Sequence, residues 1–195
     1  MNKAIFLDRD GTINEDVNYL SEINNLRIIP NAIEALRKFK NSGFLNIVIT
    51  NQSGIARGFF TEEDLDNIHK ELKKNLRYKD IELIDDIFYS PYHIEGIIEK
   101  FKIDSADRKP NIGMILSASA KYNINLSESF FIGDSYADMK CAENAGLKKI
   151  LVKTGYGSET LLKCEKDNVH IDFVAEDLNE ASDFITKQTK FSTNN

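Results

Sequence analysis

The fold of this chain is decided by the stretch Ile5-Phe6-Leu7-Asp8-Arg9-Asp10-Gly11-Thr12. Its apolar first half ends abruptly in two carboxylates and a glycine, which is typical of a buried strand that opens into a turn. The carboxylates are two residues apart, and unit charges about 4 Å apart repel by roughly 4 kcal/mol at an effective dielectric near 20. Mg²⁺, a hard cation that binds carboxylates together with phosphate and water, would relieve this repulsion. A solvated turn is the alternative interpretation of the pair taken alone.

Length and composition indicate one globular domain. The chain has 195 residues, of which 42% are hydrophobic and 29% charged, and this length is typical of a single domain with a full core. We expect the domain to span residues 1–189 and residues 190–195 to form a disordered tail. The net charge of -6 offers no general attraction to nucleic acid or to an anionic membrane, so the expected partner is a small molecule.

The cellular compartment is predicted from the cysteines and from the hydropathy of the chain. Cys141 and Cys164 do not have the spacing of metal ligands and fit a reducing compartment. Charge appears at Asp8, too early for a secretory signal, and no apolar run approaches the roughly 20 residues of a membrane span. We therefore expect a cytoplasmic protein, and we expect it to be a monomer.

Strand and helix patterns alternate along the chain. The predicted strands cover residues 4–7, 44–50, 84–89, 130–132 and 149–152, with a sixth around Phe173. The predicted helices begin at Pro30, Thr61, Pro110, Ala137 and about Leu178, with a short one near Leu161. Thr61 and Asp64 resemble a capping box at the start of the second helix. This alternation indicates a doubly wound α/β fold with a mostly parallel sheet, in which ligands bind outside the carboxyl ends of the strands. The irregular segments 11–29 and 90–109 are too short to form a large cap domain.

Polar clusters occur where predicted strands end or helices begin. They are Asp8/Asp10, Thr50/Asn51, Arg108/Lys109 and Asp134/Asp138. Together these clusters resemble the four motifs of the haloacid dehalogenase-like phosphohydrolases, and the resemblance covers nearly the whole chain. Within that superfamily, the run from Thr50 to Gly58 and the triplet Arg108-Lys109-Pro110 resemble the bacterial heptose 1,7-bisphosphate 7-phosphatases.

The resemblance implies four catalytic residues. Asp8 would attack phosphorus and become an aspartyl phosphate. Asp10 would protonate the leaving sugar oxygen and then deprotonate the water that hydrolyses this intermediate. Thr50 and Lys109 would bind the transferring phosphoryl group. Because Pro110 suits the first turn of a helix, we also expect the charge of Lys109 at the positive end of a helix dipole, which is unfavourable unless an anion lies between them.

The resemblance also implies a Mg²⁺ ion held by Asp8, by Asp134 and by the backbone carbonyl of Asp10. Asp138 is expected to support these ligands, although Ser135 and Asp138 also fit a capping box at the start of a helix. The expected substrate-binding residues are Asp16, Val17, Asn18, Tyr19, Asn51, Gln52, Ser53 and Arg108.

One motif of the family is missing from this chain. Close relatives hold a structural zinc in the second loop through cysteines and a histidine. The matching positions here are Ser90, Tyr92, Ser105 and Asp107. None of them is a thiolate, and neutral hydroxyls are poor zinc ligands. We predict that the zinc is absent and that packing holds the loop instead.

The function implied is removal of the 7-phosphate of D-glycero-D-manno-heptose 1,7-bisphosphate by a Mg²⁺-dependent phosphatase, in the supply of nucleotide-activated heptose for lipopolysaccharide or capsule. Three alternatives stay open at this point. A histidinol-phosphate phosphatase shares the aspartate and Arg-Lys-Pro patterns. A phosphoacceptor signalling domain also uses acidic residues, a threonine and a lysine on a doubly wound sheet. The third alternative is a binding protein without catalytic activity.

Overall fold

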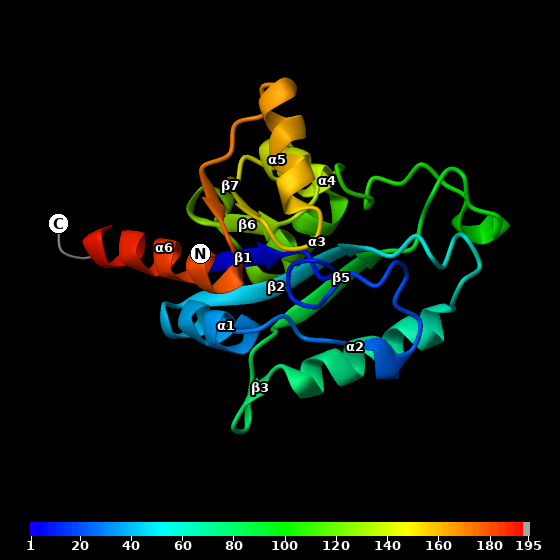
Figure 1. The fold of residues 1–195 in the computed structure, drawn as a ribbon, viewed down its shortest axis with the longest axis horizontal. Coiled ribbons are helices and arrows are strands. Elements are labelled where there is room, and N and C mark those ends of the chain that lie inside the picture. The colour runs from blue at the N-terminus through cyan, green and yellow to red at the C-terminus, as the bar shows by residue number, and fades with distance from the viewer. Residues whose placement is uncertain (193–195) are drawn as a thin grey trace.

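The computed structural model describes residues 1–192, and a parallel sheet of six strands lies at its centre (Figure 1). The strands are β1 (Lys3–Leu7), β2 (Phe44–Asn51), β5 (Asp86–Ser90), β6 (Phe130–Gly133), β7 (Lys148–Val152) and β8 (Phe173–Ala175). Their spatial order is β5-β2-β1-β6-β7-β8, and every neighbouring pair is parallel. The strand order reverses beside β1, and this reversal is where such sheets bind ligands.

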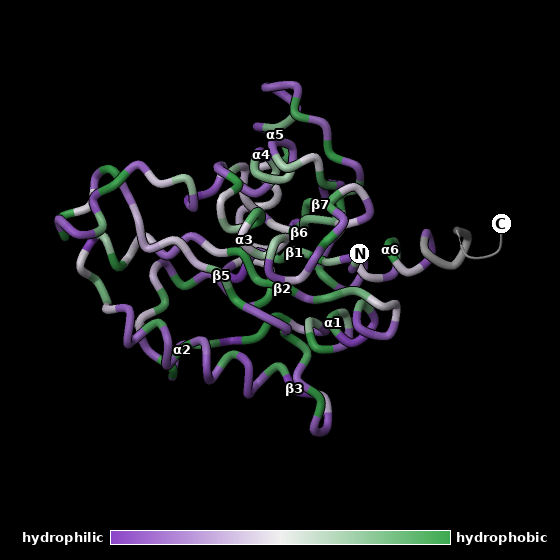
Figure 2. The backbone as a smooth tube through the Cα atoms, turned by 180° about the vertical axis from the view of Figure 1, so that it is seen from behind, coloured by the Kyte–Doolittle hydropathy of each residue, from purple (hydrophilic) through white to green (hydrophobic). Residues whose placement is uncertain are grey.

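Helices cover both faces of the sheet because β1 is apolar on both sides. The helices are α1 (Ala32–Asn41), α2 (Glu62–Asn75), α3 (Gly113–Tyr122), α4 (Tyr136–Asn144), α5 (Gly157–Lys166) and α6 (Leu178–Ser192). Ile5 and Leu7 belong to an apolar cluster that contains residues of α1, α2 and α6. Ala4 and Phe6 point to the other face, in a cluster with residues of α3 and α4. Figure 2 shows hydrophobic and hydrophilic residues alternating along α2, as expected of a helix that buries one side.

The loops that carry function leave the sheet at the same edge. Because the strands are parallel, the loops that follow β1, β2 and β5 all begin at carboxyl ends, and they extend together on the right in Figure 1. Short 3-10 helices interrupt the loops at η1 (Ile23–Asn25), η2 (Glu99–Phe101) and η3 (Leu126–Glu128). The predicted doubly wound α/β fold is confirmed, and among the described residues no helix is long and apolar enough to cross a membrane.

The predicted start of one helix and the predicted start of one strand were wrong. Helix α3 begins at Gly113 and not at Pro110, because residues 106–113 first form a turn in which Gly113 N–H donates to Ala106 O. Lys109 is therefore not at a helix N-terminus, and the dipole argument for its charge fails. The third strand begins at Asp86, two residues late, and a hairpin of β3 (Arg77–Tyr78) and β4 (Ile81–Glu82) precedes it.

The predicted boundary between the domain and its tail, at residue 189, lies within the last helix. Helix α6 continues through Ser192. The last residues of the predicted tail, 193–195, lie outside the described residues. The division into one domain and a tail stays a prediction.

Helix α2 begins with the capping box predicted from the sequence. The Thr61 hydroxyl accepts a hydrogen bond from Asp64 N–H, and the Asp64 carboxylate accepts one from Thr61 N–H. These two bonds pair backbone donors that the first turn of a helix would otherwise leave free. The cap fixes where α2 begins, and this helix carries His69 towards the site described below.

We predict that Thr61→Ala lowers the free energy of unfolding by about 0.5–2 kcal/mol, the usual cost of losing such a cap. Thr61→Ser keeps the hydroxyl and is the matched control, with stability close to that of the unmodified chain. Urea denaturation followed by circular dichroism measures both. Equal midpoints for the alanine and serine variants would show that the cap does not hold the helix.

Candidate active site

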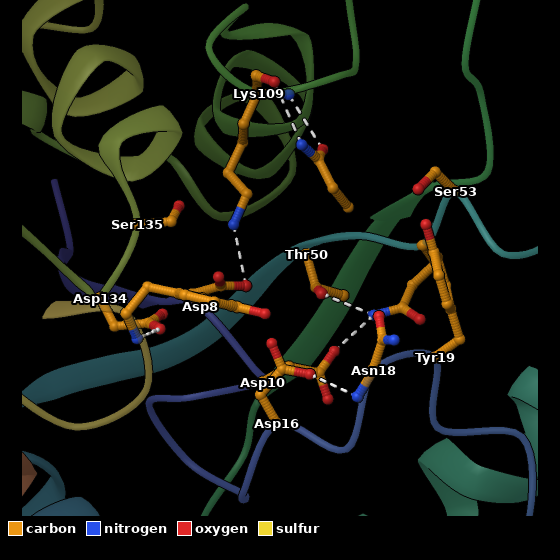
Figure 3. Close-up of a pocket in the computed structure, with 13 residues that line it drawn as sticks. Asp8, Asp10, Asp16, Asn18, Tyr19, Thr50, Ser53, Lys109, Asp134 and Ser135 are labelled. Carbon is orange, nitrogen blue, oxygen red and sulfur yellow. Dashed lines mark hydrogen bonds and ion pairs between the residues drawn. The ribbon is translucent and has the colours of Figure 1, made fainter. Parts of the chain in front are cut away.

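One cavity at the carboxyl edge of the sheet collects most of the predicted site residues (Figure 3). Its lining residues are Asp8, Asp10, Asp16, Asn18, Tyr19, Thr50, Asn51, Gln52, Ser53, Lys109, Asp134, Ser135 and Tyr156. The parallel register explains the convergence. Leu7 pairs with Val48 of β2 and with Ile132 of β6, so residues just beyond these positions emerge side by side. Asp8 N–H still donates to Ile132 O at 3.0 Å, which fixes the first carboxylate to the end of the sheet.

Three carboxylates surround one buried lysine in this cavity. Asp8, Asp134 and Asp138 can each place an oxygen within 4.8 Å of the others. Lys109 Nζ forms ion pairs with Asp8 Oδ1 at 2.8 Å and with Asp138 Oδ1 at 2.6 Å, and it donates a hydrogen bond to Ile49 O at 2.9 Å. Figure 3 shows Lys109 extending towards Asp8. If every group is ionised, three negative charges face one positive charge.

This crowding changes how the groups titrate. Burial, and next the repulsion from Asp138, raises the pKa of Asp8 well above its ordinary value although Lys109 lies beside it. The same two causes raise the pKa of Asp134 to about 7. Burial by itself would lower the pKa of Lys109, but Asp138 and Asp8 outweigh it and raise that pKa. The cavity therefore lacks positive charge, and its hard oxygen donors fit the ligand preference of Mg²⁺.

Asp138 makes two sets of contacts: it forms the predicted capping box with Ser135, and it pairs with Lys109. Its Oδ2 accepts bonds from Ser135 N–H at 2.9 Å and from the Ser135 hydroxyl at 2.6 Å, so the predicted capping box of α4 is present. Its Oδ1 pairs with Lys109. Asp138 therefore positions Lys109 while it caps the helix that follows the Asp134 loop.

Asp134 is enclosed by two glycines that leave room for its carboxylate. Gly11 and Gly155 both have positive φ, at +76° and +56°, and a Cβ on either would collide with Asp134 Oδ2. Tyr156 N–H donates to the same oxygen at 2.8 Å. Sequence analysis missed Tyr156, for which the available signal was the Gly-Tyr-Gly run just after a predicted strand.

Asp10 is held in a network of donors. Arg9 Nη2 donates to Asp10 Oδ2 at 2.8 Å and to Oδ1 at 2.9 Å, and Asn14 Nδ2 donates to Oδ1 at 2.8 Å. Gln52 Nε2 donates both to Asp10 Oδ2 at 3.0 Å and to the Thr50 hydroxyl at 2.8 Å. Burial raises the pKa of Asp10, but the Arg9 charge and these hydrogen bonds outweigh it and lower that pKa. The sequence did not indicate Arg9 or Asn14 as parts of the site.

Two predicted substrate-binding residues do not line the cavity. Val17 is 40% exposed and is not among the lining residues. Arg108 lies in a neighbouring depression and donates from Nη1 to Tyr92 O at 3.2 Å. Asn51, which does line the cavity, also exchanges two bonds with the backbone of Lys109, at 3.0 Å and 3.1 Å. It therefore fixes the lysine as well as facing the cavity.

Comparison with known proteins identifies the family. A D-glycero-beta-D-manno-heptose-1,7-bisphosphate 7-phosphatase of Salmonella typhi is 40% identical over 188 residues, which cover 96% of this chain and 97% of the relative. The chain belongs to the HAD-like hydrolases. A HAD-hydrolase-like family model matches residues 106–181. The enzyme of the same name from Escherichia coli K12 is 44% identical over 153 residues, covering 78% of this chain and 80% of the relative.

A solved structure supports the same assignment. The D,D-heptose 1,7-bisphosphate phosphatase of B. bronchiseptica, complexed with magnesium and phosphate, superposes with a TM-score of 0.83 at 29% identity over 95% of this chain and 99% of that one. This HAD-like hydrolase is a phosphoric monoester hydrolase, so the predicted enzyme class is confirmed. Neither a phosphoacceptor signalling domain nor a catalytically idle binding protein fits this assignment.

The second loop of this HAD-like hydrolase packs on an apolar cluster. Phe101 joins Ile55, Ala56, Phe60 and Leu65, with Tyr89 and Tyr92 against them. The Ala56 carbonyl accepts bonds from the N–H groups of residues 97 and 98, at 2.8 Å and 3.0 Å. Within residues 1–192, the acidic cluster in the cavity is the one group of at least three His, Cys, Asp or Glu side chains close enough to hold a metal ion.

We predict that purified protein contains less than about 0.1 zinc per chain, because Ser90, Tyr92, Ser105 and Asp107 offer no thiolate. A zinc chelator should leave the thermal midpoint of unfolding unchanged. Elemental analysis of protein prepared without chelators, together with melting curves with and without chelator, checks both statements. One tightly held zinc per chain would refute the prediction.

Proposed function

We propose that this chain is a Mg²⁺-dependent phosphatase that removes the 7-phosphate of D-glycero-D-manno-heptose 1,7-bisphosphate. The observation that carries the proposal is the convergence of Asp8, Asp10, Thr50, Lys109 and Asp134, from four separate segments of the chain, on one cavity. The substrate is proposed from the names of the relatives, one of which aligns over 97% of its length. The product would supply nucleotide-activated heptose for lipopolysaccharide or capsule.

In the proposed reaction, Asp8 is the nucleophile. A bond forms between its carboxylate oxygen and phosphorus while the bond from phosphorus to the sugar oxygen breaks, which gives an aspartyl phosphate. Asp10 gives a proton to the leaving sugar oxygen. It then takes a proton from the water that attacks the intermediate, and inorganic phosphate is released. The two carboxylates can take different roles because their partners differ: Asp8 pairs with Lys109, whereas Asp10 pairs with Arg9.

The surroundings of Asp10 suit both of its proposed steps. The Arg9 charge and the donors from Asn14 and Gln52 favour the ionised carboxylate, which can accept a proton from water. An anionic phosphoryl group beside Asp10 raises its pKa, because a nearby like charge disfavours ionisation. The raised pKa favours the protonated form of Asp10, which must donate its proton when the sugar oxygen leaves.

The side chains of Asp8 and Asp134 and the backbone carbonyl of Asp10 would hold the Mg²⁺ ion. The bound ion supplies positive charge that screens Asp8 from the phosphate dianion. Lys109 neutralises part of the remaining charge through its ion pair with Asp8. Thr50, only 1% exposed at the wall of the cavity, would donate its hydroxyl to the transferring phosphoryl oxygens.

Substrate choice is proposed to lie at the rim of the cavity. The segment 16–19 contributes Asp16, Asn18 and Tyr19 to the wall and would contact the heptose. Beside it, Arg57 and Arg108 gather near His93: burial, followed by the charges of these two arginines, lowers the pKa of His93. Arg57 pairs with Glu95 at 3.4 Å, whereas Arg108 donates to a backbone carbonyl and is affected by the like charge of Arg57. We therefore propose that Arg108 binds the 1-phosphate that stays on the sugar.

We predict that Asp8→Asn lowers turnover by about 10³-fold or more and that Asp10→Asn lowers it by about 10²–10⁴-fold, since neither amide can perform the carboxylate chemistry. Phosphate release from both anomers of heptose 1,7-bisphosphate and from histidinol phosphate measures this, and the comparison of substrates separates the two phosphatase assignments. Asp66→Asn, on the exposed side of α2, is the matched control. Unimpaired turnover in either site variant would refute the proposed roles.

We predict that Arg108→Ala raises the KM for the heptose bisphosphate by roughly 10- to 100-fold, the value of a charge-assisted hydrogen bond. The KM for the corresponding 7-monophosphate should change less than about twofold, because that substrate has no 1-phosphate for Arg108 to bind. Steady-state kinetics on the two substrates provides the comparison, with the exposed Arg77→Ala as control. Equal effects on both substrates would remove Arg108 from this role.

A further inference from the structure

Arg9 is a buried charge in direct contact with the proposed acid and base. It is fully buried and among the largest side chains so enclosed. One nitrogen of its guanidinium, Nη2, faces Asp10 and also Gln52 Oε1 at 3.2 Å. The nitrogen on the other side, Nη1, lies 3.1 Å from His69 Nε2. The planar guanidinium thus has partners on two sides: Asp10 and Gln52 at the cavity, and His69 on helix α2.

In the hydrogen bond between Arg9 and His69, Arg9 must be the donor. A guanidinium has donors only and does not lose its proton in proteins. His69 Nε2 must therefore accept the bond, which places the ring proton on Nδ1 when the ring is neutral. Burial, followed by the Arg9 charge, lowers the pKa of His69 to about 3, so the acceptor form persists under ordinary assay conditions. The ring is 8% exposed and packs edge-on against Tyr89 at 5.9 Å.

His69 cannot touch the substrate, since it is not among the residues that line the cavity. Its influence on the reaction must pass through Arg9. Without the acceptor at 69, a buried arginine donor would be unpaired, which costs about 1–3 kcal/mol and favours another orientation of the guanidinium. The same guanidinium fixes both oxygens of Asp10, so rotating it also moves or releases that carboxylate.

We propose that His69 is a positioning residue for the phosphatase reaction: it holds Arg9, and through Arg9 it holds the Asp10 carboxylate in the orientation that proton transfer requires. The inference rests on the proposed acid and base role of Asp10. Gln52 completes the arrangement, because its amide contacts Arg9, Asp10 and Thr50 together. Helix α2, which has no residue in the cavity wall, thereby takes part in the chemistry.

The test compares His69→Gln, which keeps an acceptor, with His69→Leu, which keeps a similar volume without one. We expect His69→Leu to lower kcat on heptose 1,7-bisphosphate by roughly 10- to 100-fold with KM within about twofold, because small misplacements of a reacting group cost this much. His69→Gln should keep kcat within about threefold of the unmodified chain. Ile68→Val, a buried change at the neighbouring position of the same helix, is the control and should leave kcat unchanged.

The outcomes separate positioning from mere packing. A His69→Leu enzyme with normal kcat would overturn the proposal, and so would a His69→Gln enzyme that loses as much as His69→Leu. If His69→Leu does not fold, as judged by its melting curve, His69→Met replaces it under the same criterion. Asp10→Asn, measured in parallel, distinguishes the two levels: full activity there refutes the role of Asp10 itself, whereas an inactive Asp10→Asn beside a normal His69→Leu refutes only the role of His69.

Discussion

The ion pairs of Lys109 with Asp8 and Asp138 are the constraint on which the rest of the site depends. They join three distant parts of the chain: the end of β1, the loop after β5 and the start of α4. Burying a lysine or an aspartate alone would be costly, and each of these charges is tolerated because the others and the Ile49 carbonyl surround it. The balance is incomplete, however, because Asp134 adds a third carboxylate. Burial, together with this excess of negative charge, keeps the pKa of Asp8 high. The same excess makes the cavity receptive to a divalent cation.

The sheet makes this concentration of charge possible. Parallel strands end at one edge, and β1 lies between β2 and β6, so three polar strand ends emerge as neighbours. The space between the backbone and the Asp134 carboxylate then limits which residues can occupy the neighbouring positions. Gly11 and Gly155 come so close to the Asp134 carboxylate that a side chain at either position would displace it. Apolar clusters pack on the two faces of the sheet and support the edge at which the charged groups converge.

The sequence predicted the features that depend on local pattern. The strand ending at Leu7 and the capping boxes at Thr61 and Ser135 follow from spacing within a few residues, and the structure contains them. Features that depend on a choice between local alternatives were less predictable: Pro110 suits a turn as well as a helix start, and here it lies in a turn. The His69 contact joins residues 60 positions apart, so no local pattern could indicate it. Val17 and Tyr156 show the same limit, since which side of a loop faces the cavity is set by tertiary packing.

The cavity divides into a buried floor and a more exposed rim, and this division follows from where each group is anchored. The floor residues Thr50, Lys109 and Asp134 are almost fully buried and are tied to strand ends, so their geometry is set by the fold. The rim residues Tyr19 and Tyr156 are 38% and 49% exposed and belong to loops. The Tyr19 ring packs against the Phe59 ring, with centroids 4.7 Å apart. The rim therefore contains a contact between the loop after β1 and the loop after β2. Under the proposed function, substitutions in the rim would alter which sugar is accepted without moving the proposed catalytic groups of the floor, because the rim residues are anchored in loops and the floor residues at strand ends.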